Sequence, residues 1–218
     1  MNSGYSFRLN NLTGIMMPDC FFRPTYILFD LPQAVTRQVN RIREKFDPCR
    51  AGLNAEVSIT GSSGVGTLVP GQSPRKVFSE VQRIAGQLSA FQTGFRAVDS
   101  FPETGIYFFV MTDEEIFLRV HKLFCEADIQ YRTSPHRYLP HCTLTLFDEP
   151  LPAETARKIM ALPVPEGRFK VDNISVYSID EQGLNPELLY RVELKTITRS
   201  NVRNGGYEEK RSEYNEHQ

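Results

Sequence analysis

The sequence predicts an α+β fold in which neighbouring strands run antiparallel. Patterns typical of strands and of helices interleave along the 218 residues, but several strands also follow one another directly, joined only by a turn. Such adjacent pairs favour antiparallel neighbours over the doubly wound parallel sheet of an α/β protein. Two strands, residues 56–60 and 141–147, also share one alternation of polar and apolar residues. The chain is therefore expected to form one domain, or one domain built from two similar halves.

The first predicted strand leads directly into a helix. Residues 25–31, TYILFDL, form an aromatic and β-branched run that is typical of a buried strand. Pro32 suits the first turn of a helix that continues to about Phe46. The apolar residues of this helix recur at helical spacing: Val35, Val39, Ile42 and Phe46. Its cations are expected on the solvated faces: Arg37, Arg41, Arg43 and Lys45.

The middle of the chain contains further strands and helices. A strand at residues 56–60 leads into a loop rich in glycine and serine, residues 61–66. This loop lacks the Gly-Lys-Ser/Thr end of a P-loop. Its backbone amides could approach an anion, but a flexible connection is the preferred interpretation. A helix is predicted over residues 74–90, and two strands over residues 92–98 and 105–111.

The last part of the fold begins with a well-marked helix at residues 113–127. Thr112 or Asp113 can cap this helix, and the acidic residues that follow suit the positive end of its dipole. The remaining predicted elements are the strand at residues 141–147, a short helix at residues 152–161 and a terminal hairpin of strands at residues 169–179 and 188–195.

The two ends of the chain lack the apolar periodicity of the rest. We expect residues 1–24 to form a loose N-terminal arm. Residues 198–218 are polar and mixed in charge, and we expect them to form a tail with few core contacts. The folded domain then spans residues 25–197.

Composition narrows the possible partners. The formal net charge of −1 gives no general basic field, so DNA is not an expected partner and an RNA contact would need a local patch. No apolar run approaches the ~20 residues that cross a bilayer, and no secretory signal is visible. The four cysteines show no CxxC spacing, which favours reduced thiols over a zinc site. We expect a cytoplasmic protein with no membrane contact, no metal and no cofactor.

The two similar strands carry the candidate chemistry. Period-two alternation places His141 and Thr143 on one face of their strand, and Glu56 and Ser58 on one face of theirs. A histidine and a hydroxyl on one face are suited to holding a phosphate. If the two strands lie side by side, their polar side chains line a near-symmetric cleft.

Several segments together resemble the two-histidine (2H) phosphoesterase superfamily, which includes the 2′,5′ RNA ligase-like and cyclic phosphodiesterase proteins. The resemblance covers roughly Thr25 to Leu194. It rests on TYILFDL, EVSITG before the glycine-rich loop, GIYFFVM before an acidic-capped helix and, most specifically, RYLPHCTLTLF. It implies a bilobal, pseudo-twofold β-sheet cleft with helices outside. It also implies metal-independent hydrolysis of 2′,3′-cyclic phosphates or of 2′,5′-linked RNA ends or small nucleotides.

The family pattern is a histidine, any residue, then threonine or serine, once in each lobe. His141, Thr143 and Ser58 match this pattern, and Glu56 stands where the first histidine would be. Imidazole, with an ordinary pKa of about 6.5, can serve as acid or base, whereas a carboxylate of pKa about 4.3 is ionised at neutral pH. Glu56 could therefore act as the base beside a protonated His141. It could instead be a neutral donor with a pKa raised by burial, or it could mark an impaired site.

Residues near the second motif are candidates for substrate binding. Arg132, Arg137 and Tyr138 could contact phosphate or stack on a base, although plain surface roles fit them equally well. The leading hypothesis is a metal-independent phosphodiesterase whose partner is a nucleotide or an RNA end. The alternatives are a catalytically impaired family member that binds such a ligand, or an interaction scaffold with a vestigial cleft.

Overall fold

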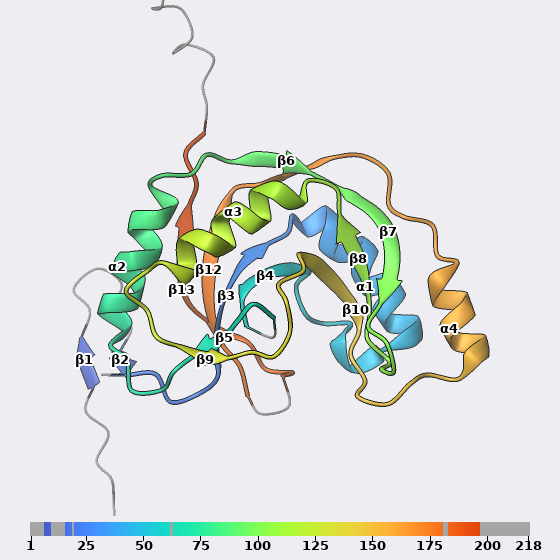
Figure 1. Cartoon of the computed structure of the whole chain (residues 1–218), viewed down its shortest axis with the longest axis horizontal. Coiled ribbons are helices and arrows are strands. Elements are labelled where there is room, and N and C mark those ends of the chain that lie inside the picture. The colour runs from blue at the N-terminus through green and yellow to red at the C-terminus, as the bar shows by residue number, and fades with distance from the viewer. Residues whose placement is uncertain (1–6, 10–15, 19, 62, 181–182, 197–218) are drawn as a thin grey trace, which may run out of the picture.

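The computed structural model describes residues 7–9, 16–18, 20–61, 63–180 and 183–196 (Figure 1). Its elements are, in chain order, β1 (Phe7–Leu9), β2 (Met16–Pro18), β3 (Thr25–Asp30), α1 (Gln33–Phe46), the 3₁₀ helix η1 (Pro48–Arg50), β4 (Glu56–Thr60), β5 (Val65–Leu68), α2 (Pro74–Ala85), β6 (Phe91–Thr93), β7 (Phe95–Ser100), β8 (Tyr107–Met111), α3 (Glu114–Cys125), β9 (Tyr131–Thr133), β10 (His141–Thr145), α4 (Ala153–Met160), β11 (Phe169–Val171), β12 (Asn173–Ser178) and β13 (Glu187–Glu193). None of the described helices is both long and apolar enough to cross a membrane.

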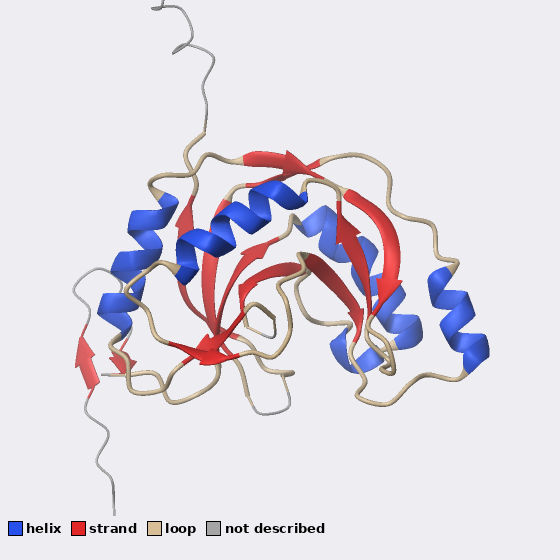
Figure 2. Cartoon of the chain, in the orientation of Figure 1, coloured by secondary structure: helices blue, strands red, loops and turns tan. Residues whose placement is uncertain are grey.

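Two antiparallel sheets form the centre of the molecule. The larger sheet has the strand order β13-β12-β3-β4, and the smaller has the order β10-β8-β7. Helices α2 and α3 contact β13 and β4 of the larger sheet, whereas α1 and α4 contact β10 and β7 of the smaller one. Figure 2 shows the helices around the strands, with α2 at one end and α4 at the other. The predicted α+β fold with antiparallel neighbours is therefore confirmed.

One extended segment runs between the two halves and changes sheet at Gly94. Strand β6 pairs with β11, whereas β7, directly after Gly94, pairs with β8. The Gly94 amide donates to Thr112 Oγ1 at 3.0 Å, and a Cβ at this position would lie only 3.0 Å from the Gly167 carbonyl oxygen. The single strand predicted over residues 92–98 is consequently two strands.

A single hydrophobic core lies behind both sheets. Phe29 of β3 packs edge-to-face on Phe91 and on Phe117, each at a centroid distance of 5.6 Å. Phe21, which precedes the first strand of the larger sheet, is 2% exposed and packs edge-to-face on Phe78 of α2. The segment just before β3 is therefore anchored to the body of the protein by one aromatic side chain.

Several short elements differ from the prediction. Strands β5 and β9 pair with each other, so Val65 and Gly66 belong to a strand and not to the flexible loop expected over residues 61–66. Strands β1 and β2 pair within the segment expected to be a loose arm. The strand predicted over residues 169–179 is divided into β11 and β12. The tail predicted over residues 198–218 lies outside the described residues.

Candidate functional site

Strands β4 and β10 lie beside each other, although they belong to different sheets. Val57 and Ile59 of β4, and Cys142 and Leu144 of β10, are all 0% exposed and belong to the same core. Because side chains alternate along a strand, the residues between them turn away from that core. Glu56 and Ser58 thus share the outer side with His141 and Thr143, as the repeated strand pattern predicts.

Hydrogen bonds between β4 and the segment that contains β10 hold this arrangement. The backbone of Glu56 hydrogen-bonds the thiol of Cys142, the residue directly after His141. The hydroxyl of Tyr138 donates to the Ser58 carbonyl oxygen at 2.9 Å. Each contact joins a residue of β4 to the segment that carries His141, so the two halves meet at the motif strands.

Arg43 of α1 adds a buried link to the backbone of the same region. Its guanidinium donates to the Thr143 carbonyl oxygen through Nε at 3.3 Å and Nη2 at 2.7 Å. Nη1 donates to the carbonyl oxygens of Leu53, at 3.1 Å, and Asn54, at 3.4 Å, just before β4. The side chain is 0% exposed, so the expectation that Arg43 lies on a solvated face is wrong. Its helix position faces the smaller sheet, where carbonyl oxygens satisfy the cation.

The ring of His141 is held in a defined tautomer. Nδ1 lies 2.7 Å from the Leu139 carbonyl oxygen, which can only accept a hydrogen bond. The hydrogen is therefore on Nδ1, and Nε2 is the acceptor atom of the neutral ring. Phe101 and Phe108 pack against the ring, at centroid distances of 5.5 and 4.8 Å. Burial lowers the pKa of His141, which favours the neutral form.

Burial also favours the neutral form of Glu56. Burial raises the pKa of its carboxyl group, against the lowering influence of Arg50 and then Arg43. The Ser58 hydroxyl donates to Oε2 at 3.1 Å, and the negative charge of Asp30, the neighbour of Glu56 in the sheet register, raises the pKa further. Burial thus favours the neutral form of this carboxyl group, and which of the three possibilities holds for Glu56 stays a prediction.

A polar network on the outer face of the larger sheet supports Asp30. This carboxylate accepts hydrogen bonds from Ser175 at 2.5 Å, from Tyr177 at 3.1 Å and from Arg191 at 2.6 Å. No local sequence pattern indicates this network. Alternation within TYILFDL places Asp30 on the outer face, but its partners come from strands more than a hundred residues away.

The three candidates for substrate binding are placed differently. Tyr138 is 7% exposed and stacks on His121 of α3 with centroids 3.9 Å apart. In turn, His121 Nδ1 lies 2.7 Å from the Ile59 carbonyl oxygen, so the stacked pair of Tyr138 and His121 is held against β4. Arg132 of β9 and Arg137 are exposed at the surface. A direct contact of any of the three with substrate stays a prediction.

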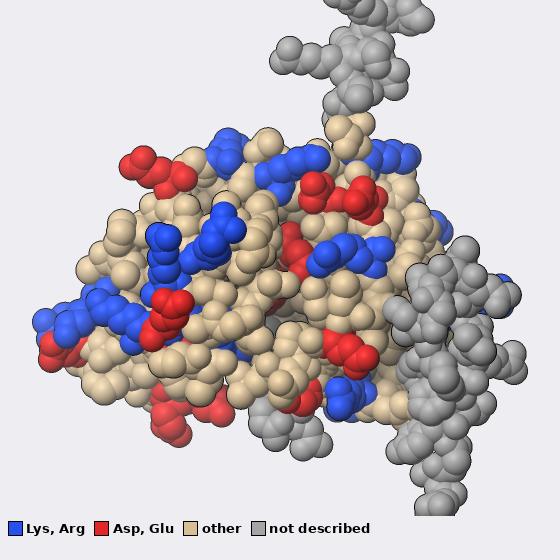
Figure 3. All heavy atoms as spheres, turned by 180° about the vertical axis from the view of Figure 1, so that it is seen from behind, with Lys and Arg blue, Asp and Glu red and all other residues tan. Residues whose placement is uncertain are grey.

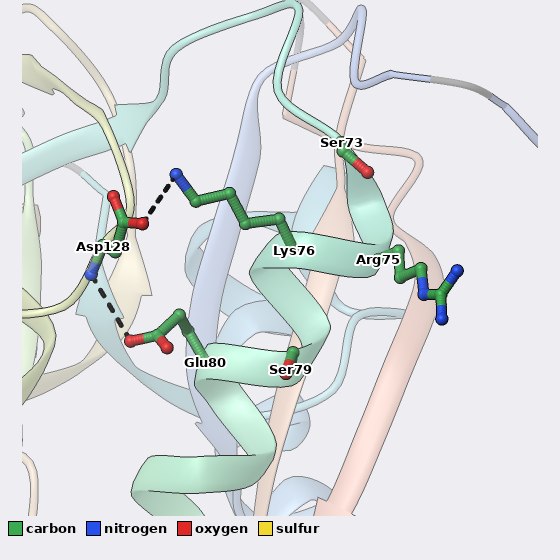
Figure 4. Close-up of a pocket in the computed structure, with 6 residues that line it drawn as sticks. All are labelled: Ser73, Arg75, Lys76, Ser79, Glu80 and Asp128. Carbon is green, nitrogen blue, oxygen red and sulfur yellow. Dashed lines mark hydrogen bonds and ion pairs between the residues drawn. The ribbon is translucent and has the colours of Figure 1, made fainter.

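A separate pocket of about 380 Å³ lies on α2, away from the motif strands. Figure 4 shows its lining at the start of the helix, with Asp128 opposite. Its charges largely satisfy one another, because Lys76 pairs with Asp128 at 2.9 Å and Glu80 accepts the Asp128 amide at 3.4 Å. The candidate chemistry therefore lies at β4 and β10.

From the side opposite to Figure 1, the surface is hollowed near its middle, with acidic atoms in the wall (Figure 3).

Among the described residues, no group of three or more His, Cys, Asp or Glu side chains is placed to hold a metal ion. The free cysteines are dispersed over the described fold, and burial raises the pKa of the Cys142 thiol to about 12.

Comparisons with known proteins bear on the family and the fold. A model of the 2′-5′ RNA ligase superfamily matches residues 31–183. No curated protein sequence matches the chain. Among solved structures, TT0787 of Thermus thermophilus is similar, with a TM-score of 0.55 and 16% identity, over 79% of this chain and 98% of that one.

LigT of E. coli is similar to the same extent. Its apo structure has a TM-score of 0.54 and 15% identity, and its complex with 3′-AMP has a TM-score of 0.54 and 16% identity. Both comparisons cover 79% of this chain and 98% of LigT. At these identities the structural likeness supports the fold, while the family model supports the relationship.

Proposed function

Because the chain belongs to the 2′-5′ RNA ligase superfamily, we propose that it is a phosphodiesterase that acts without a metal ion on 2′,3′-cyclic phosphates or on 2′,5′-linked RNA ends or small nucleotides. The observation that carries the proposal is the position of Glu56 and His141 on adjacent strands, where both side chains face away from the core beside Ser58 and Thr143. His141 is favoured as a neutral base, and Glu56 is favoured as a neutral acid. Two groups with these states can share the proton transfers of phosphodiester hydrolysis.

The proposed reaction uses the atoms that face outward from β4 and β10. His141 Nε2 accepts a proton from water while the water oxygen bonds to phosphorus. The bond from phosphorus to the 2′ or 3′ oxygen breaks, and the Glu56 carboxyl group protonates that leaving oxygen. The hydroxyls of Thr143 and Ser58 donate to the non-bridging oxygens as their charge grows. Proton exchange with solvent then restores both groups.

The related structures support a nucleotide-type ligand. LigT has been crystallised in complexes with 3′-AMP and with phosphate. A nucleoside 3′-monophosphate such as 3′-AMP is the product when hydrolysis of a 2′,3′-cyclic nucleotide breaks the bond between phosphorus and the 2′ oxygen.

A binding protein without turnover is the second candidate. The observation that favours it is the sheet register, which sets Asp30 directly beside Glu56. Two carboxyl groups at a phosphate site repel an anion when both are ionised, by roughly 4 kcal/mol for each unit charge at ~4 Å and an effective dielectric of 20. A scaffold with a vestigial cleft would show neither turnover nor nucleotide binding.

Hydrolysis of a 2′,3′-cyclic nucleotide, with and without EDTA, tests the proposal. We expect turnover that EDTA does not inhibit and that His141→Ala lowers by ~10²–10⁴-fold. His136→Ala is the matched control, because His136 is an exposed histidine outside the motif, and this variant should retain the wild-type rate. Binding of the nucleotide by calorimetry without any turnover would contradict the enzyme and support the binding protein.

A further inference from the structure

Arg50 is a cation brought to the motif strands by the short helix η1. The turn is held by backbone hydrogen bonds from Arg50 N to Asp47 O at 3.1 Å and from Leu53 N to Arg50 O at 3.0 Å. The Asp47 carboxylate in turn accepts the Leu146 amide at 3.0 Å, directly after β10. The backbone at Arg50 is thus fixed relative to both the start of β4 and the end of β10.

The guanidinium of Arg50 lacks the partners that the other arginines of this region have. Its Nε atom is buried and has no hydrogen-bond partner, and the side chain makes no ion pair with any described residue. Arg43 is satisfied by backbone carbonyls, and Arg191 pairs with Asp30 at 2.6 Å. A buried donor left unpaired costs free energy, so such a group calls for a specific explanation.

Arg50 lies within electrostatic range of the proposed proton donor. Arg50 is the strongest charged influence on Glu56, and it also acts on the hydroxyl of Tyr26 in β3. The charged and titratable groups that interact with Glu56 come from η1, α1, β3, β10 and the segment before β10: Arg50, Arg43, Asp30, Tyr26, Tyr138 and Cys142. The guanidinium of Arg43 already donates to backbone carbonyl oxygens, whereas the Nε–H of Arg50 has no acceptor among the described residues.

We propose that Arg50 binds the non-bridging oxygens of the substrate phosphate, a deepening that rests on the proposed phosphodiesterase site. An arginine can present two parallel N–H donors to a phosphate, and one of them in Arg50 is the Nε–H that has no partner among the described residues. The ligand class is then a nucleotide or RNA end that carries a phosphodiester, or the phosphomonoester left after hydrolysis.

Occupancy of Arg50 by phosphate has a consequence for Glu56. In the empty site the positive charge of Arg50 favours the ionised carboxylate. A bound phosphate neutralises that charge and adds a negative one nearby, so the carboxyl group binds its proton more tightly. At a pH near or above the pKa of Glu56, ligand binding is therefore coupled to proton uptake by this carboxyl group, which keeps the donor protonated as the substrate arrives.

Calorimetry with a nucleoside 3′-monophosphate, inorganic phosphate and phosphate-free adenosine tests this role. We expect Arg50→Gln to weaken binding of both phosphate-bearing ligands by roughly 10- to 100-fold, the effect of losing a hydrogen-bonded charge. Adenosine binding should not change. The matched control is Arg41→Gln, because Arg41 is an exposed arginine of α1 to which we assign no role at the motif strands. Arg50→Lys should recover part of the phosphate affinity.

Proton uptake gives a second readout that a structural defect would not reproduce. Repeating the titrations in buffers of different ionisation enthalpy measures the protons taken up on binding. We expect uptake by the wild type and less uptake by Arg50→Gln and by Glu56→Gln. If Arg50→Gln is folded by thermal melting and binds phosphate as tightly as Arg41→Gln, the role of Arg50 is refuted.

Failure of this inference can be distinguished from failure of the proposed function. Phosphate binding that depends on Arg50, without turnover of a cyclic nucleotide, would overturn the enzymatic proposal and support the Arg50 subsite. Normal turnover in Arg50→Gln with unchanged phosphate affinity would overturn the subsite alone.

Discussion

Arg43 is a buried cation that holds the backbone of both motif strands without entering the outer face. It donates to the Thr143 carbonyl oxygen in β10 and to the Leu53 carbonyl oxygen before β4. Burial lowers the pKa of its guanidinium, and the surrounding carbonyl dipoles compensate the charge that remains. The position of His141 and Glu56 relative to each other therefore depends on a residue that takes no part in proton transfer.

We predict that Arg43→Ala destabilises the fold by about 3 kcal/mol, because it leaves several buried carbonyl oxygens without a donor. Urea unfolding measures the loss. Arg37→Ala removes an exposed arginine from the same helix and should change the free energy of unfolding by no more than about 0.5 kcal/mol. Equal stability of the two variants would show that the Arg43 hydrogen bonds contribute little.

The motif residues could be predicted one by one, whereas their charged neighbours could not. Period-two alternation alone places Glu56 with Ser58 and His141 with Thr143. The influence of Arg50 and Asp30 on Glu56 depends on how η1, β3 and β4 pack together. No local pattern carries that information, and for the same reason Arg43 looked like an ordinary surface cation.

The turn between β4 and β5 is an element whose glycines have a packing role. Gly64 has φ 71°, and its amide donates to the His136 carbonyl oxygen at 2.7 Å. A Cβ at Gly64 would lie 2.3 Å from the His121 ring and 2.8 Å from Tyr138 Cβ. The glycine thus allows the turn to close over the stacked pair that supports β4.

Gly64→Ala is expected to destabilise the protein by about 2–4 kcal/mol, through backbone strain together with the collision against the stacked rings. Gly71→Ala provides a control, because Gly71 also has a positive φ, of 88°, but a Cβ there meets nothing within 4 Å. That variant should lose only about 1 kcal/mol from strain. A melting temperature that falls equally in both variants would contradict the packing role.

Long elements with clear periodicity were predictable, and short ones were not. The predicted helix from Pro32 to Phe46 agrees with α1, since its apolar spacing and its first-turn proline point the same way. Strands β5 and β9 pair with each other although some sixty residues separate them in the sequence. The sequence of such short segments does not indicate a pairing of this kind. At the start of α3, Asp113 holds the cap position but bonds Thr112 and Arg168 instead of capping the helix.

Across the whole molecule, the two sheets bring the proposed acid and the proposed base together at their neighbouring edge strands, β4 and β10. The larger sheet supplies Glu56 and the smaller sheet supplies His141, and one core lies behind both. Neither half alone holds both groups. The repeated strand pattern predicted that two similar halves would meet in this way, and the contact between β4 and β10 agrees with it.

The central claim is that Glu56 donates a proton and His141 accepts one. It is tested most directly by the pH dependence of cyclic-nucleotide hydrolysis in the wild type and in Glu56→Gln. Activity should fall at low pH as His141 gains a proton, and at high pH as Glu56 loses one. Because burial lowers the first pKa and raises the second, the maximum should lie between these two values.

Glu56→Gln should lower kcat by ~10²–10⁴-fold and remove the fall at high pH. Its residual activity should then rise with pH to a plateau, since only a neutral His141 is still required. The opposite assignment, with Glu56 as base and His141 as acid, gives the same bell for the wild type. It differs in the variant, where residual activity that falls as pH rises would contradict our account.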